Sequence, residues 1–95
     1  MVKIGDVRPF KYTYADDKGQ FLKPLEEAAE LFGAWQDWVR KRASPRYSSK
    51  ARDEMLDEAA DVIQAVANCA ASVGVDDMSD LMRRCELRNA RRGRY

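Results

Sequence analysis

Apolar residues recur with helical spacing in two long stretches of the sequence, and this periodicity constrains the fold more than any other feature. Between residues 24 and 42, and again between 50 and 73, the apolar side chains fall on one half of a helical wheel. We expect these halves to form the core. The residues concerned are Leu25, Ala28, Ala29, Leu31, Phe32, Trp35, Trp38 and Val39 in the first stretch, and Met55, Ala59, Val62, Ile63, Val66, Cys69, Ala70 and Val73 in the second.

Residues typical of helix ends flank both stretches. Pro24 suits the first turn of the first helix, because its missing N–H is not needed there. Ser49 is suited to cap the second helix, and Gly74 is suited to stop it. The sequence therefore predicts helices over about 24–42 and 50–73.

A third, shorter helix is expected after Gly74. Asp76 or Asp77 can cap it, and it should run to about Asn89 before a basic tail. Residues 1–22 show only short apolar alternations and are predicted to form an extended arm. The arm is then followed by a helical domain over residues 23–95.

The size of the chain bears on its assembly. With 95 residues the chain forms one domain at most, and a domain this small buries only about 60% of the surface that its unfolded chain exposes. We therefore predict an all-α bundle of about three main helices per chain, completed by oligomerisation.

Composition excludes several classes of function. Histidine is absent, which removes histidine-based triads and histidine zinc sites. Cys69 and Cys85 lack metal-type spacing and are expected to be buried free thiols. No stretch approaches the roughly 18 apolar residues of a membrane span, and residues 1–10 lack the apolar region of a secretory signal. We therefore expect a cytoplasmic protein with no membrane contact.

Acidic residues border both apolar stripes. Glu27 and Glu30 lie three residues apart at the edge of the first stripe, and Glu58 and Asp61 repeat this spacing on the second, with Glu54 one turn earlier. If the two helices pack on their apolar faces, the four carboxylates of Glu27, Glu30, Glu58 and Asp61 can meet in a partly buried groove.

A solvated helix face is the competing explanation for such a stripe, but the neighbouring charges argue against it. The pairs Glu26/Glu30, Glu54/Glu58 and Asp57/Asp61 are like-charged at a spacing of four residues, and each destabilises its helix by about 0.2–0.5 kcal/mol. A bound cation would compensate them. Mg²⁺ prefers hard oxygen ligands and commonly bridges protein carboxylates to phosphates, so these carboxylates are candidate magnesium ligands.

The acidic motifs also resemble those of a known family. Glu27-Ala28-Ala29-Glu30, followed by Glu58-Ala59-Ala60-Asp61-Val62, is similar to the Glu-x-x-Glu and Glu-x-x-Asp signature of MazG-like nucleotide pyrophosphohydrolases. The ending Asn89-Ala90-Arg91-Arg92-Gly93-Arg94-Tyr95 resembles the tail of that family, and Gly74 to Asp80 resembles its linker into the last helix.

This resemblance implies a fold, an activity and an assembly. It implies an all-α enzyme that hydrolyses nucleoside triphosphates to monophosphate and pyrophosphate, depends on Mg²⁺ with Mn²⁺ as a substitute, and forms homodimers or homotetramers. Cys85 stands where family members often have a lysine, so Arg84 or Arg88 would have to supply that phosphate contact.

Under this interpretation each candidate residue has a role. Glu27, Glu30, Glu58 and Asp61 would hold the metal, and Glu54 would add a ligand or accept the proton of the attacking water. The residues expected to bind substrate are Asn89, Arg92, Arg88 and Lys50 at the phosphates and Trp38 at the base, although core packing is the competing role of Trp38.

Two other functions compete with the enzyme: a nucleic-acid-binding module and a structural dimerisation bundle. Six of the 17 basic residues lie in 83–94, so an arginine-rich helix and tail could track the phosphates of a nucleic acid. This module would leave the acidic stripes unexplained, and we therefore do not expect nucleic acid as the partner. A purely structural dimerisation bundle would use the acidic residues only as the rim of an interface.

Overall fold

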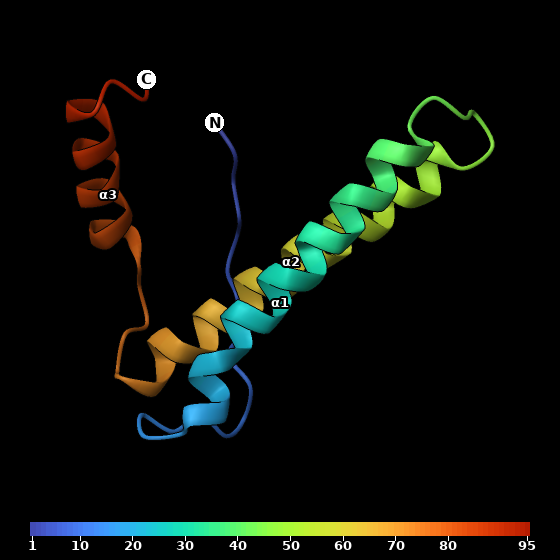
Figure 1. Ribbon diagram of the computed structural model, residues 1–95. Coiled ribbons are helices and arrows are strands. Elements are labelled where there is room, and N and C mark those ends of the chain that lie inside the picture. Colours follow the sequence, from blue (N-terminus) through green and yellow to red (C-terminus); the bar gives the residue numbers. More distant parts are fainter.

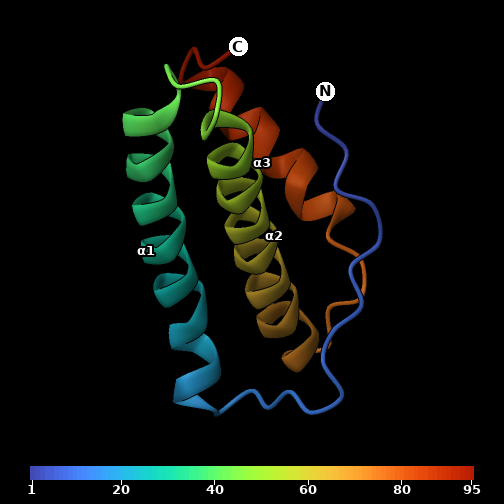
Figure 2. The same ribbon diagram turned by 90° about the vertical axis from the view of Figure 1, so that its right-hand side faces the viewer.

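The computed structural model describes residues 1–95 and contains three helices and no strand. These are α1 (Lys18–Lys41), α2 (Ser48–Ser72) and α3 (Ser79–Arg91), as Figure 1 shows. α1 and α2 run antiparallel, side by side, as a long hairpin in both Figure 1 and Figure 2. The prediction of an all-α chain with three main helices is confirmed.

Packing between α1 and α2 is the only helix–helix contact in the chain. Few residues are fully buried, and all of them belong to α2: Ala51 and Ala65 are the only buried apolar residues, and Asn68 is the third buried residue. Larger apolar side chains such as Leu31, Val62 and Ile63 are half-buried beside them. The hairpin is therefore held by a narrow seam.

The prediction that the whole apolar half of each helix is core is wrong for the single chain. Leu25 and Phe32 on α1 keep 69% and 57% of their surface exposed, and Trp35, Val66 and Val73 are also exposed. The physical reason is geometric, because one neighbouring helix covers only part of a stripe that spans half the circumference. The two cysteines, predicted to be buried, are only half-buried.

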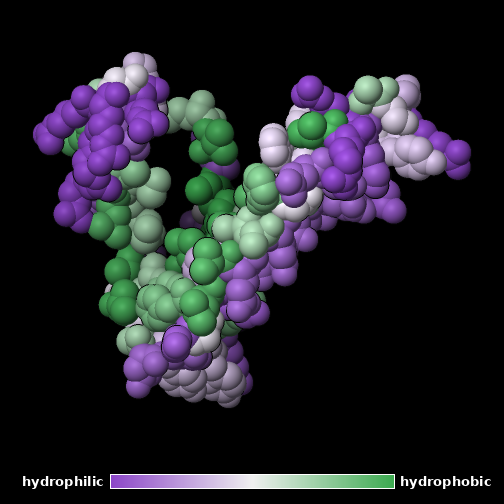
Figure 3. Space-filling model, in the orientation of Figure 1, coloured by the Kyte–Doolittle hydropathy of each residue, from purple (hydrophilic) through white to green (hydrophobic).

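α3 stands away from the hairpin and contacts neither α1 nor α2 (Figure 1). Leu81, Cys85 and Asn89, spaced four residues apart, are its half-buried positions, whereas Met82 and Leu87 are exposed. Figure 3 shows apolar side chains gathered between α3 and the hairpin, while hydrophilic ones cover the outer side of α3. Both α3 and the hairpin of α1 and α2 therefore expose apolar side chains.

The first helix begins earlier than predicted. Asp17 caps α1, with its side chain accepting a hydrogen bond from the Gln20 N–H at 3.2 Å, so Pro24 lies inside the helix instead of in its first turn. An interior proline leaves the carbonyl four residues earlier without its N–H partner. Here that carbonyl belongs to Gln20, and it accepts from the Cys69 thiol at 3.6 Å. Packing against α2 therefore offsets part of the cost of the proline.

The predicted cap of the second helix is also corrected. α2 begins at Ser48 after Tyr47, without a side-chain cap, and Ser49 is inside it. The Ser44 carbonyl accepts from the N–H groups of Tyr47 and Ser48, at 3.1 and 3.0 Å. This backbone turn satisfies amides that a serine side chain would otherwise serve.

Glycine ends the second helix as predicted. Gly74 has φ +84°, and the Val75 and Gly74 N–H groups donate to the carbonyls of Ala70 and Ala71, both at 3.0 Å. This is the Schellman arrangement, in which a left-handed residue closes the helix. A side chain on this residue would be strained at that φ.

The third helix has Met78 as its N-cap residue and no side-chain cap there, so neither Asp76 nor Asp77 takes the predicted N-cap position. The Asp77 carboxylate accepts from the Ser79 N–H at 2.9 Å and from its hydroxyl at 2.6 Å, one residue before the N-cap position of Met78. These bonds hold the pKa of Asp77 below its ordinary value. The helix runs to Arg91, two residues past the predicted end, and closes at Gly93 (φ +71°).

None of the three helices is both long enough and apolar enough to cross a bilayer.

Two glycine substitutions with opposite expected signs test this account of the helices. Gly74→Ala should lower the free energy of unfolding by about 1–2 kcal/mol, because alanine is strained in the left-handed region. Gly33→Ala should raise it by about 0.5–1 kcal/mol, because an added Cβ in the middle of α1 meets nothing within 4 Å. Urea unfolding followed by circular dichroism measures both, and equal signs would contradict the assigned end of α2.

Candidate functional site

Carboxylates from the two long helices converge beside the seam of the hairpin. Carboxylate oxygens of Glu27 on α1 and of Glu58 and Asp61 on α2 all lie within 4.8 Å of one another. Glu27 and Glu58 are half-buried and Asp61 is exposed. The structure therefore brings together three of the four predicted metal ligands, as their position at the edge of the apolar stripes suggested.

Glu30, the fourth predicted ligand, is exposed and acts on this group electrostatically. Burial raises the pKa of the Glu58 carboxyl above its ordinary value, and the charges of Glu30 and Asp61 raise it further. Burial, followed by the neighbouring Glu30, also raises the pKa of Glu27. The carboxylates thus repel one another in a partly dehydrated site.

One carboxylate oxygen of Glu58 has neither a water nor a protein group as a hydrogen-bond partner. Glu58 Oε2 is inaccessible to solvent and makes no hydrogen bond, and it is the only buried side-chain polar atom of the chain in that state. A buried carboxylate oxygen without a partner is costly. A bound divalent cation would satisfy it, so the residues present fit a hard metal ion with oxygen ligands.

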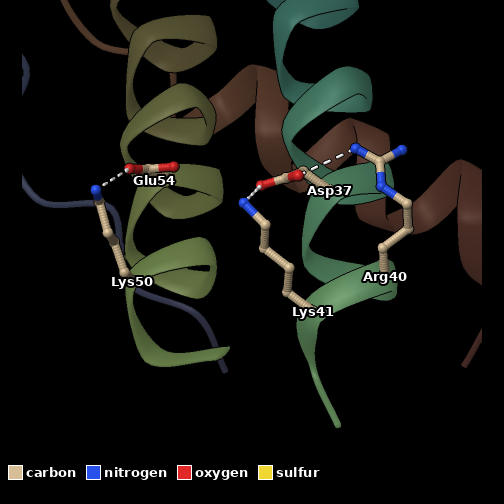
Figure 4. Close-up of polar contacts among 5 residues, drawn as sticks. All are labelled: Asp37, Arg40, Lys41, Lys50 and Glu54. Atoms are coloured by element: carbon tan, nitrogen blue, oxygen red, sulfur yellow. Dashed lines mark hydrogen bonds and ion pairs between the residues drawn. The ribbon is translucent and has the colours of Figure 1, made fainter. Parts of the chain in front are cut away.

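No lysine or arginine neutralises the cluster by an ion pair. Lys23, the nearest candidate on α1, pairs with Glu26 at 3.0 Å instead. Figure 4 shows two further sets of charges that are satisfied among themselves. Asp37 binds both Arg40 and Lys41, at 3.0 and 3.1 Å, and these bonds, that to Lys41 foremost, hold the pKa of Asp37 below its ordinary value.

The other charges in Figure 4 include two predicted site residues. Glu54 and Lys50 form an ion pair at 3.8 Å on α2, with both side chains largely exposed. Glu54 lies one turn before Glu58 but outside the group of three converging carboxylates. In this structure Lys50 therefore contacts Glu54 and no member of the cluster.

Trp38 lies three turns beyond Glu27 along α1 and is half-buried. The Arg42 guanidinium sits over its ring, 5.7 Å from the centroid. Trp35, by contrast, stacks on Phe32 with 5.6 Å between ring centroids. The contacts of Trp38 are those of a packing residue covered by a cation.

The predicted phosphate-binding residues of α3 are not near the carboxylates in the single chain. Arg88, Asn89 and Arg92 lie on or just after a helix that contacts neither α1 nor α2. Asn89 donates to the Cys85 sulfur at 3.5 Å, within its own helix. Arg83 pairs with Asp80 at 2.9 Å.

A cavity beside the cluster involves residues to which the sequence interpretation gave no role. It has a volume of about 540 Å³ and is lined by Glu27 and Asp61 together with Phe10 and Tyr12 from the segment before α1. The amides of Gln20, Gln64 and Asn68 also line it. The available signal was the spacing of Gln64 and Asn68, one and two turns after Asp61 on the border of the apolar face.

No protein-family model, curated protein or solved structure matches this chain.

Metal-free stability should depend on the charge of Glu58. Because the folded-state pKa of this carboxyl is raised, its ionisation lowers the free energy of unfolding as the pH rises from the ordinary glutamate pKa of about 4.3 through the raised value. Glu58→Gln removes that charge and should raise the Tm at pH 7 in chelator. The gain should shrink as the pH falls toward about 4.

Glu54→Gln is the matched control for this measurement. It removes a carboxylate one turn away whose only ion pair is exposed, so its Tm should change little or fall slightly at pH 7. Differential scanning calorimetry over the pH series compares the two variants. A Tm loss for Glu58→Gln at pH 7 in chelator would contradict the account of mutual repulsion.

Proposed function

We propose that this chain is a magnesium-dependent nucleoside triphosphate pyrophosphohydrolase, similar to the MazG-like enzymes, that cleaves (d)NTP to (d)NMP and pyrophosphate. The observation that carries the proposal is the convergence of three carboxylates from two helices, one of which, Glu58, has a buried oxygen without a partner. Mn²⁺ would fit the same oxygen ligands. Such an activity would serve nucleotide-pool house-cleaning in the cytoplasm.

The residues that would hold the metal are Glu27, Glu58 and Asp61, with Glu30 beside them. When bound, such an ion would supply positive charge to the triphosphate oxygens and would lower the pKa of a water molecule. Water attacks the α-phosphorus and the bond to the β-phosphate oxygen breaks, so that monophosphate and pyrophosphate leave.

Glu54 is the proposed acceptor of the water's proton or an additional ligand. It stands one turn before Glu58, and its only partner is the exposed Lys50, 3.8 Å away. An exposed pair of this kind is worth little. Separating Lys50 from Glu54 would therefore cost little free energy, so Glu54 could accept a proton and Lys50 could contact a phosphate.

Self-association is part of the proposal. The exposed apolar surface of α1 and the detachment of α3 support a homodimer or homotetramer in which these faces are covered. In such an assembly α3 of a second copy brings Arg88, Asn89 and Arg92 toward the carboxylates. Arg84 or Arg88 then takes the place of the family lysine.

A nucleic-acid-binding module is the alternative function, and one observation favours it. The detached α3 carries exposed arginines that continue into the tail at Arg92 and Arg94. Binding of this kind weakens steeply with salt and needs no divalent ion. Retention of an oligonucleotide at low salt in the presence of chelator, without nucleotide hydrolysis, would favour this alternative.

Pyrophosphate release tests the enzyme directly. Ribo- and deoxynucleoside triphosphates with Mg²⁺ should yield monophosphate and pyrophosphate, and chelator should abolish the reaction. Glu58→Gln and Asp61→Asn should each lower kcat/KM by about 100-fold or more, since even residues behind metal ligands typically cost about 10–100-fold. Asp53→Asn, on the same helix with an exposed side chain paired to Arg52, is the matched control and should leave the rate unchanged.

Mg²⁺ should also raise the Tm of the wild-type protein but not that of Glu58→Gln, because a ligand bound only to the folded form stabilises it. A folded protein whose Tm rises with Mg²⁺ but which releases no pyrophosphate from any nucleotide would overturn the proposed reaction. An unchanged Tm would instead favour a purely structural bundle.

Sedimentation velocity tests the assembly. The wild type should sediment as a dimer or tetramer, and Trp35→Lys, which places a charge on the exposed stripe of α1, should shift it toward monomer. Tyr47→Lys is the matched control, because Tyr47 is 47% exposed against 45% for Trp35 but lies in the loop before α2. A monomeric wild type at all concentrations would contradict self-association.

A further inference from the structure

The cavity beside the carboxylate cluster is lined by residues of α1, of α2 and of the segment before α1. Glu27 and Asp61 belong both to the cluster and to the cavity wall, so the two are continuous. Its volume of about 540 Å³ lies within the range of small-molecule sites, roughly 300–1,000 Å³. Part of its wall comes from residues before α1, which form neither helix nor strand.

Two amide side chains of α2 hold this wall in place. Gln64 Nε2 donates to the Arg8 carbonyl at 2.9 Å and to Asn68 Oδ1 at 3.0 Å, and Asn68 Oδ1 also accepts from the Phe10 N–H at 2.9 Å. A backbone N–H only donates and a carbonyl only accepts, so these bonds fix the orientation of both amides. These hydrogen bonds therefore anchor the part of the cavity wall that comes from the segment before α1.

The same network leaves one donor and one acceptor unused. Asn68 is only 7% exposed, yet its Nδ2 donates to no group of the chain, and Gln64 Oε1 accepts from none. Both side chains line the cavity. Glu58 Oε2 is the only buried side-chain polar atom without a partner, so Asn68 Nδ2 is open to solvent, and a ligand in the cavity can take the place of water at this donor.

Aromatic rings complete the wall. Phe10 and Tyr12 line the cavity while remaining 64% and 69% exposed. Rings that are held near a cavity but not buried in a core are suited to stack on a planar ligand. Asp61 and Asn68 stand seven residues apart on α2, about 10.5 Å along the helix axis, which is comparable to the span from phosphate to base in a nucleotide.

We infer that this cavity binds the nucleobase of a mononucleotide whose phosphates lie at the carboxylate cluster. The base stacks on Tyr12, and its edge accepts from Asn68 Nδ2 and donates to Gln64 Oε1. This inference rests on the proposed function for the position of the phosphates. The segment before α1 then acts as the base-binding wall of the site.

Two measurements separate the base site from the reaction. First, metal-free titration of ¹⁵N-labelled full-length protein with nucleosides, followed by NMR, should shift the side-chain amide signals of Asn68 and Gln64. Tyr12→Ala should weaken this binding by about 5- to 150-fold, the range corresponding to the stacking of one base on an aromatic ring. Tyr14→Ala is the matched control, since Tyr14 lies in the same segment and is also exposed but does not line the cavity.

Second, hydrolysis of a nucleoside triphosphate should be compared with that of inorganic tripolyphosphate, which has no base. Tyr12→Ala should raise KM for the nucleotide and leave tripolyphosphate unaffected. Nucleoside binding that shifts the two amides and depends on Tyr12 supports the inference even if no nucleotide is hydrolysed, in which case only the proposed reaction fails. Absence of these shifts, or equal effects of Tyr12→Ala and Tyr14→Ala, overturns the inference even if hydrolysis is rapid.

Discussion

The contact between α1 and α2 positions the carboxylate cluster and the cavity beside it. The two helices pack side by side, so side chains at the border of the seam can meet across it. The side chains that meet there are carboxylates. Close packing removes water from Glu58, and the neighbouring acids raise the pKa of its carboxyl. The interaction that builds the hairpin is therefore also the one that makes the cluster unfavourable without a cation.

The segment before α1 depends on this hairpin through α2. Hydrogen bonds join Phe10 to Asn68 and Arg8 to Gln64 across 58 and 56 residues of sequence. Such bonds hold the backbone of the segment without burying its aromatic side chains, and this is why a cavity remains beside Glu27 and Asp61. A third helix packed at the same place by apolar side chains would have filled that space.

The periodicity of the sequence predicts the features that depend on residues close together in the chain. The two long helices, the glycine stop at Gly74 and the convergence of Glu27 with Glu58 and Asp61 followed from spacing alone, since residues three or four apart share a helix face. The early start of α1 did not, because the cost of Pro24 is offset by a distant thiol, Cys69. The extent of the core and the position of α3 were not predictable either. An apolar stripe indicates that a helix face will be buried, but it does not indicate which element of the same or another chain buries it.

The separation of charge in this chain has a consequence for the proposed chemistry. If the arginines of α3 folded onto the carboxylates of their own hairpin, they would neutralise Glu58 and Asp61 and compete with any metal for the same oxygens. Because α3 contacts neither long helix, the carboxylates stay free for a cation, and Arg88 and Arg92 stay free for phosphate. A nucleoside triphosphate with its metal carries both complements, so it can bridge the two surfaces without either being satisfied beforehand. Under the proposed function, the metal of such a substrate would supply the missing partner of the Glu58 oxygen.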